Sequence, residues 1–315
     1  MEVISMPMWA WILFYALVIV MLYADLKLFG RKGQHEVNIS EALKMTAVWI
    51  IVSLIFCGGI WYFEGDNKAM EFLAGYLIEK SLSMDNLFVF LMLFSFFGVQ
   101  RKYQHEVLFW GIFGALILRS IFIFAGAAMV QRFEWILGVF GVFLIYTGIK
   151  MFSHKDDESV DPSKNIFVKL FKKFFPVTDQ MHEDKFFIVE QGKRLATPLF
   201  IALLVIETTD VAFAVDSIPA VFSVSRDPFI VLTSNIFAIL GLRALYFALA
   251  AVAKYFKYLK YGLGIILSFV GVKMLLDLFG IYEVPTWMSL LIIFGILVLS
   301  MLASYVATLY SRKRQ

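Results

Sequence analysis

Five acidic side chains lie within long apolar stretches of the chain, where an ionised group is most costly. They are Glu79, Asp85, Glu207, Asp210 and Asp216. An ionised carboxylate near the centre of a membrane helix costs about 2.5 to 3.5 kcal/mol on insertion scales, so five unpaired ones cost more than about 10 kcal/mol. The available compensations are water, protons, a bound metal ion, or the nearby cations Lys80, Arg119 and Arg243.

The polar side chains beside these acids are oxygen donors, and neither histidine nor cysteine stands close to them in the sequence. An all-oxygen set favours hard cations such as Mn²⁺, Mg²⁺ and Ca²⁺ over Zn²⁺ or Cu⁺. The sequence therefore predicts a metal site with the ligands Glu79, Asp85, Asn86, Glu207, Asp210 and Asp216. Secondary candidates are Ser83, Thr208, Ser217, Val215, Arg119, Arg243 and Asp25.

The spacing of the acids in the second acidic segment predicts a local change of the backbone. Glu207 and Asp210 are three residues apart and share a helix face, whereas Asp210 and Asp216 are six apart. Six residues of α-helix give about 9 Å of rise and about 120° of rotation, so a straight helix does not bring this pair onto one ion. Pro219 clashes with the carbonyl of Val215, so we expect unwinding and a freed carbonyl oxygen beside Asp216.

Three of the secondary candidates have two interpretations each. Arg119 and Arg243 either neutralise a carboxylate when the metal leaves or form a structural ion pair, and the sequence leaves both open. Asp25 falls at the inner end of the first apolar segment, where it either guards an entrance or extends to the membrane surface. We expect the second, because it is the default for a charged side chain near the end of a membrane helix.

The composition of the whole chain is that of a membrane protein. Of its 315 residues 61% are hydrophobic and 17% are charged, and the mean hydropathy is +0.80. Every backbone amide must be hydrogen-bonded internally in lipid, so recurring apolar runs of about 18 residues predict a helical bundle in the bilayer. The dispersed basic residues and the net charge of +3 indicate no nucleic-acid partner. The single Cys57 excludes an intramolecular disulfide and a thiolate-rich metal site.

About nine membrane spans are predicted, which makes the fold class all-α and polytopic. Their approximate ranges are residues 8–29, 42–63, 70–97, 107–130, 134–152, 197–223, 229–253, 260–279 and 287–310. The first run has neither a basic flank nor a cleavage signature, so we expect a helix and not a signal peptide. An external N-terminus and a cytoplasmic C-terminus place most Lys and Arg residues of the connections in the cytoplasm, as the positive-inside rule requires.

The 153–196 connection is the one sizeable polar segment. An acidic linker, HKDDESVD, precedes the basic and Phe-rich run NIFVKLFKKFFP, which predicts a helix at the inner headgroup layer. Two short extended segments around Gly192 predict a small hairpin. His154 and His182 could sense metal together with the neighbouring carboxylates, but a solvated loop is the expected interpretation.

Three consecutive segments recur in the same order in the two halves of the chain. EKSLSMDNLFVF at 79–90 aligns with DVAFAVDSIPAV at 210–221, FGALILRSIF at 113–122 with FAILGLRALY at 237–246, and GVFLIYTGIKM at 141–151 with GIILSFVGVKM at 264–274. The charged positions match as Glu79 with Asp210, Asp85 with Asp216, and Arg119 with Arg243. Because each unit has three spans, the second is expected to be inverted, with a binding site at the interface near the midplane.

These observations divide the chain into five parts. They are two N-terminal helices in 1–63, a first three-helix repeat in 70–152, a cytoplasmic loop in 153–196, an inverted second three-helix repeat in 197–279, and a C-terminal helix with a basic tail in 287–315. Many secondary transporters are built from two inverted units that open one site to either side in turn.

Two motifs closely resemble the TerC family of integral membrane proteins. They are SLSMDNLFVF, preceded by YLIEK, and ETTDVAFAVDSIPAVF, followed by DPFIVLTSNIFAILGLRALYF, and the resemblance covers essentially the whole chain. It implies a bacterial inner-membrane protein of the wider LysE-type exporter superfamily, in a branch for which manganese export has been proposed. The acidic positions of the family correspond to Glu79, Asp85, Glu207, Asp210 and Asp216, and Asn86 matches its Asp-Asn pair. Thr209 stands where many members have Ser, which keeps the hydroxyl.

The leading functional hypothesis is a divalent metal cation transporter, with Mn²⁺ as the exported cargo, Ca²⁺ as a second candidate and no prosthetic group. Protons are the natural counter-ion, because clustered carboxylates can exchange a metal ion for protons. A second hypothesis is a membrane adaptor that holds a structural ion and supports metallation or secretion of partner proteins. An intramembrane enzyme is the least favoured class, because no nucleophile or histidine stands beside the acids. The direction of transport and the oligomeric state stay open.

Overall fold

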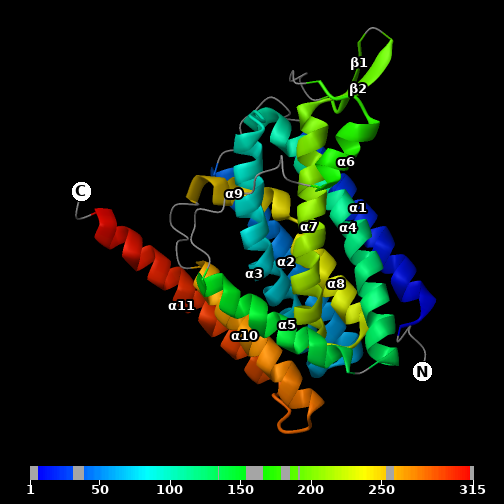
Figure 1. Cartoon of the computed structure of the whole chain (residues 1–315). Coiled ribbons are helices and arrows are strands. Elements are labelled where there is room, and N and C mark those ends of the chain that lie inside the picture. Colours follow the sequence, from blue (N-terminus) through cyan, green and yellow to red (C-terminus); the bar gives the residue numbers. More distant parts are fainter. Residues whose placement is uncertain are drawn as a thin grey trace.

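The described part of the protein is a bundle of helices with one small β-hairpin (Figure 1). The computed structural model describes residues 6–30, 39–133, 135–153, 166–178, 185–190, 192–252 and 259–312. Its helices are α1 (Met8–Gly30), α2 (Ile39–Glu64), α3 (Asp66–Phe96), α4 (Arg101–Arg132), α5 (Ile136–Ser153), α6 (Ile166–Phe174), α7 (Pro198–Phe222), α8 (Pro228–Ile239), α9 (Leu242–Val252), α10 (Leu259–Leu278) and α11 (Thr286–Arg312). The strands β1 (Phe187–Glu190) and β2 (Lys193–Ala196) pair antiparallel. The predicted all-α class is therefore confirmed, with the hairpin as a minor addition.

Six of the described helices are long and apolar enough to cross a membrane, and a seventh span results if the bent pair α8 and α9 counts as one. The six are α1, α2, α4, α7, α10 and α11. Two further predicted spans coincide with α3, which carries several charged side chains, and with α5, whose apolar part is short. Each predicted span thus overlaps a helix or the bent pair, while the count of nine stays a prediction.

Two helices of the second half begin at signals that are visible in the sequence. The side chain of Thr197 accepts a hydrogen bond from the amide of Phe200, and Pro198 follows as the first residue of α7. Asp227 accepts one from the amide of Phe229 at 2.9 Å, directly before α8. Such side chains satisfy amides that a helix start leaves unpaired, and proline fits there because it has no amide hydrogen.

α7 is one continuous helix, so the unwinding expected between Asp210 and Asp216 is wrong. Pro219 lies in the last turn of α7. The missing amide hydrogen of Pro219 removes the hydrogen bond to the carbonyl of Val215, but the helix continues through this position to Phe222. The two acids keep their helical separation of about 9 Å along the axis and point to different sides of α7. The side chain of Val215 between them is 51% exposed.

The break in the second half lies instead between α8 and α9. The two helices differ in direction by 41°, and Leu240 and Gly241 join them. Lys80 of α3 donates a hydrogen bond to the carbonyl oxygen of Ala238 at 3.0 Å. A cation is favourable at this point, because the last carbonyl groups of a helix carry partial negative charge.

Gly241→Ala is expected to destabilise the protein by about 1 to 3 kcal/mol. Gly241 has a φ of +82°, and an added Cβ would lie 2.6 Å from Cγ of Trp49 and 2.7 Å from its Cβ. The measurement is thermal unfolding of the purified protein in detergent. Gly59→Ala is the control, because no atom lies within 4 Å of a Cβ at Gly59. Equal unfolding temperatures for the two variants would contradict the predicted strain.

α5 and α10 lie side by side, with their backbones in contact (Figure 1). A Cβ on Gly148 would lie 2.6 Å from the carbonyl oxygen of Gly264, and one on Gly141 would lie 3.0 Å from that of Gly271. Residue numbers rise along one helix as they fall along the other, so the two helices are antiparallel. Small residues at such contacts are typical of membrane helix pairs, because they let the helices approach closely.

The contacts of the two halves are reciprocal. In the predicted repeat, Gly141 aligns with Gly264 and Gly148 aligns with Gly271. If each residue is replaced by its equivalent in the other half, the contact of Gly148 with Gly264 becomes the contact of Gly271 with Gly141, which is also present. α3 packs on α8, and α7 packs on α4, so the first helix of each unit contacts the second of the other. Two units related by a two-fold axis make such contacts. The inverted repeat itself stays a prediction.

The segment before α7 contains the predicted amphipathic helix and hairpin. α6 covers the basic, Phe-rich run, and β1 and β2 enclose Gly192, whose φ is +77°. The centroid of the Phe200 ring lies 5.0 Å from that of Phe171 and 4.6 Å from that of Phe187. Aromatic contacts therefore join α6 and the hairpin to the start of α7. His154 and His182 lie outside the described residues, and the position of α6 at the headgroup layer stays a prediction.

Candidate functional site

Arg119 of α4 is the centre of a polar network in the interior of the bundle. Its side chain is 0% exposed. The guanidinium donates two parallel hydrogen bonds to Asp210 of α7, from Nε to Oδ2 at 3.0 Å and from Nη2 to Oδ1 at 2.9 Å. Its Nη1 donates to Oε1 of Glu79 of α3. Three helices therefore each contribute one charged group, and the two-point pairing fixes the orientation of the guanidinium.

Uncharged side chains complete this network. Asn235 of α8 donates from Nδ2 to Oε2 of Glu79 at 2.8 Å, and Ser83 donates to Oε1 of Glu79 at 3.1 Å. Nη1 of Arg119 also donates to the hydroxyl of Ser217 at 3.4 Å and to Oδ1 of Asn235 at 3.3 Å. Both oxygens of each carboxylate thus accept hydrogen bonds, which is what burial of ionised groups requires.

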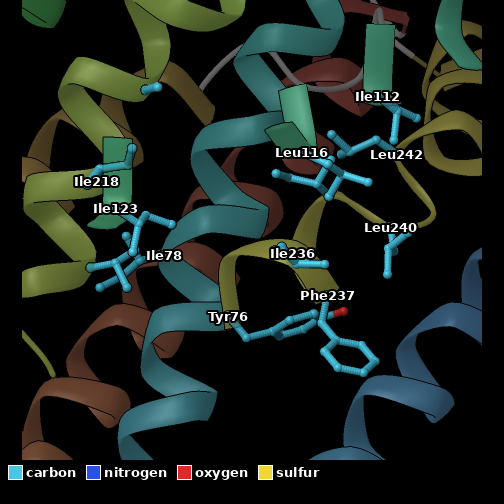
Figure 2. Close-up of a cluster of buried hydrophobic side chains, with 14 of the residues drawn as sticks. Tyr76, Ile78, Ile112, Leu116, Ile123, Ile218, Ile236, Phe237, Leu240 and Leu242 are labelled. Carbon is cyan, nitrogen blue, oxygen red and sulfur yellow. The ribbon is translucent and has the colours of Figure 1, made fainter. Parts of the chain in front are cut away.

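Buried apolar side chains lie on the same helices as this network. Figure 2 draws buried hydrophobic residues that come from the same helices, α3, α4, α7 and α8, together with α9. Three buried isoleucines each adjoin a network residue in the sequence. They are Ile78 beside Glu79, Ile218 beside Ser217 and Ile236 beside Asn235. Electrostatic interactions in such surroundings are stronger than in water, and an unpaired charge is costly. The pairing of the three charged groups therefore stabilises the fold.

The remaining predicted ligands do not join this network. Oε2 of Glu207 is buried without a hydrogen-bond partner, and the carboxylate contacts the position of Gly114 on α4. Asp216 faces α5, where the hydroxyl of Thr147 donates to its Oδ1 at 3.5 Å. Asn86 is buried, at 3% exposed. The side chain of Asp85 lies outside the part of the protein that the structure describes.

Among the described side chains, no three of histidine, cysteine, aspartate or glutamate come together as a metal site. Glu79 and Asp210 are near each other, but the guanidinium of Arg119 lies between them. Thr208 donates its hydroxyl to the carbonyl of Val205 at 3.0 Å. The predicted ligand set therefore stays a prediction, and the structure adds that two of its acids are paired with an arginine.

The predicted equivalence of Arg119 and Arg243 does not extend to their partners. Arg243 of α9 forms an ion pair with Asp25 of α1 at 3.1 Å and donates to its carbonyl oxygen at 2.7 Å. Asp25 is only 6% exposed, so the expected extension to the membrane surface is wrong. The burial of Arg243 supplies the reason, because each charge compensates the other away from water.

Asn235 is a network residue that the sequence analysis did not single out. It is the only side-chain amide in α8, within the apolar run PFIVLTSNIFAI. A polar amide in a fully buried membrane segment needs hydrogen-bond partners. The position of Asn235 in an apolar run therefore indicated that its side chain is hydrogen-bonded to another part of the protein. Its two partners, Glu79 and Arg119, come from helices far away in the sequence, and the spacing of residues gave no hint of them.

These features define a multi-pass helical membrane protein with a charged network buried between its two halves. Residues 64–314 match the family described as "Integral membrane protein TerC family", and the chain belongs to this family. The identification agrees with the resemblance that the two acidic motifs carry.

Several curated relatives are similar over nearly their whole length. The chain is 48% identical to "Uncharacterized membrane protein STKORF319" of Myxococcus xanthus, over 94% of the chain and 92% of the relative. It is 47% identical to "Putative membrane-bound redox modulator Alx" of Escherichia coli K12, over 95% of each. A membrane protein of Rickettsia bellii is 39% identical over 94% of the chain and 97% of its own length. No solved structure matches the chain.

Proposed function

We propose that the protein is a divalent metal cation transporter and that it exports Mn²⁺. The observation that carries the proposal is the pair of carboxylates, Glu79 and Asp210, that α3 and α7 bring together around one arginine. Ionisable groups within a membrane bundle are costly, and they are typical of ion pathways. Membership of the TerC family supports an ion-transport role.

The chemistry of the donors supports a hard divalent ion as cargo. Glu79 and Asp210 offer carboxylate oxygens, and Ser83 and Ser217 offer hydroxyls beside them. Further oxygen donors along the proposed pathway are Asp85 and Asn86 of α3 and Asp216 of α7, whose carboxylate faces α5. Oxygen donors of this kind suit Mn²⁺ and Ca²⁺.

The reciprocal packing supports alternating access as the mechanism. The first helix of each predicted unit contacts the second helix of the other, so a shift of one unit against the other moves Glu79 relative to Asp210. The close contact of α5 with α10 provides a surface about which such a shift can occur. In the proposed cycle the site opens first to the cytoplasm and then to the outside, and protons serve as counter-ions.

The proposed orientation has the N-terminus outside and the C-terminus in the cytoplasm of a bacterial inner membrane. The hairpin and α6 lie at the end of the bundle opposite to the N-terminal end of α1 (Figure 1). Lys169, Lys172 and Lys173 on α6 support a cytoplasmic position for that end, by the positive-inside rule.

A membrane adaptor is the second candidate function, and the hairpin favours it. β1 and β2 extend from the bundle (Figure 1), and Val189 at the hairpin is 72% exposed, so a partner protein could bind there. The relatives named as redox modulators also fit a role other than transport. In this chain, however, the single cysteine, Cys57, cannot form an intramolecular disulfide.

Purified protein in liposomes is expected to move Mn²⁺ across the bilayer, with Asp85→Asn and Asp216→Asn reducing the flux to the level of empty liposomes. Each substitution removes a carboxylate from the proposed pathway without a change in size. The assay follows ⁵⁴Mn uptake with and without a pH gradient, and Asp277→Asn is the control because its ion pair with Arg226 is largely exposed. An adaptor gives no flux with any of these proteins. Normal flux in both pathway variants would show that the site assignment is wrong.

A further inference from the structure

We propose that Arg119 changes its carboxylate partner when the cargo ion binds, leaving Asp210 and pairing with Glu207. This inference rests on the proposed transport function and assigns Glu207 a role other than metal ligand. Arg119 would act as a built-in cation that competes with the metal for Glu79 and Asp210.

The first observation is that every carboxylate oxygen of Glu79 and Asp210 accepts a hydrogen bond from a neighbouring side chain. Both oxygens of Asp210 accept hydrogen bonds from Arg119. Oε1 of Glu79 accepts from Arg119 and Ser83, and Oε2 accepts from Asn235. A divalent ion at these oxygens would also be repelled by the guanidinium at short range, because repulsion is strong in a medium of low dielectric constant. Binding of the metal to Glu79 and Asp210 therefore requires Arg119 to leave them.

The second observation is a buried carboxylate oxygen without a hydrogen-bond partner on the facing helix. Oε2 of Glu207 is buried and accepts no hydrogen bond, although a buried carboxylate oxygen is normally satisfied. The carboxylate lies against Gly114 of α4, where an added Cβ would overlap it. Gly114 thus leaves the space that Glu207 occupies beside the helix that carries Arg119.

The geometry of α4 and α7 places this acid within reach of a reoriented arginine. Gly111 contacts Ile206 and Gly126 contacts Phe222, so the two helices run in the same direction. Glu207 precedes Asp210 by three residues, which is about 4.5 Å along the helix axis. Side chains on a helix lean toward its N-terminus, which is the direction from Arg119 to the level of Gly114. In the proposed exchange the guanidinium is redirected by a change of rotamer, and α4 itself stays in place.

The charges of the four groups match a divalent cargo. Three carboxylates, Glu79, Asp210 and Glu207, and one guanidinium carry two net negative charges when all are ionised. One divalent ion makes the group neutral, provided that Arg119 stays inside and pairs with Glu207. Neutrality is favoured among buried charges, so a divalent ion suits these four groups better than a monovalent one.

A double-mutant cycle on Mn²⁺ affinity tests the exchange. The four proteins are wild type, Arg119→Gln, Glu207→Gln and the double variant, and equilibrium dialysis of the detergent-purified protein against Mn²⁺ measures binding. Arg119→Gln is expected to bind Mn²⁺ about tenfold more tightly, because the competing cation is gone. Glu207→Gln is expected to weaken binding about tenfold in the wild-type background, and to change it little in the Arg119→Gln background.

The inference would be overturned if Glu207→Gln reduced the affinity for Mn²⁺ equally in the wild-type and Arg119→Gln backgrounds. Glu207 would then be a direct ligand of the metal. That outcome leaves the proposed function intact, whereas a wild-type protein that neither binds nor moves Mn²⁺ would remove the proposed function as well. Arg119→Lys is the second background, because it retains a positive charge if Arg119→Gln fails to fold. In the Arg119→Lys background, the loss of Mn²⁺ affinity caused by Glu207→Gln must then differ from the loss in the wild-type background. An unchanged loss of affinity also contradicts the exchange.

Discussion

Asp210→Asn is expected to destabilise the protein by about 3 kcal/mol, because it replaces a carboxylate that accepts two hydrogen bonds from the buried Arg119 and leaves Glu79 as the one carboxylate of the network that still pairs with Arg119. Asp210 accepts two hydrogen bonds from Arg119, and both side chains of the pair are almost inaccessible. An asparagine offers a single acceptor oxygen, and its amide group would face the guanidinium donors. We expect a lower unfolding temperature and a smaller yield of monodisperse protein in detergent.

Asp277→Asn is the matched control for this substitution. Its carboxylate pairs with Arg226 at 3.3 Å, but the two side chains are 37% and 51% exposed. Ion pairs in contact with water contribute about 0 to 1 kcal/mol, so this variant should unfold close to the wild type. If Asp210→Asn were as stable as Asp277→Asn, the buried network would not contribute to the fold as described.

Gly148→Ile is expected to cost about 3 kcal/mol and to separate α5 from α10, because the added atoms overlap backbone atoms. A Cβ at this position would lie 2.6 Å from the carbonyl oxygen of Gly264 and 2.8 Å from the amide nitrogen of Ser268. Neither atom can move without its helix. The unfolding temperature in detergent and the Mn²⁺ flux in liposomes are both expected to fall.

Gly295→Ile is the control for the packing prediction, because a Cβ at Gly295 of α11 meets no atom within 4 Å. The same added volume should therefore be tolerated there. Retention of the wild-type unfolding temperature by Gly148→Ile would mean that α5 and α10 are not held together by the glycine contacts.

The sequence by itself determined the class of protein and most of its helices. The apolar runs had the length of membrane spans, and in lipid only helices or closed barrels satisfy the backbone, so each predicted span coincides with a helix or the bent pair. A local signal also located the hairpin around Gly192. The same reasoning singled out Glu79, Asp210 and Arg119, because charged residues in apolar runs are rare and costly.

The tertiary structure alone decided how these side chains pair. Arg119 contacts Asp210, 91 positions away, and Asn235 contacts Glu79, 156 positions away. The sequence also predicted a break in α7 from Pro219, whereas the break occurs at Gly241, where α8 and α9 meet beside Trp49. Local propensity acts over a few residues and predicts helices and caps. The partner of a buried charge depends on which helix faces meet, and this is fixed by the packing of the whole bundle.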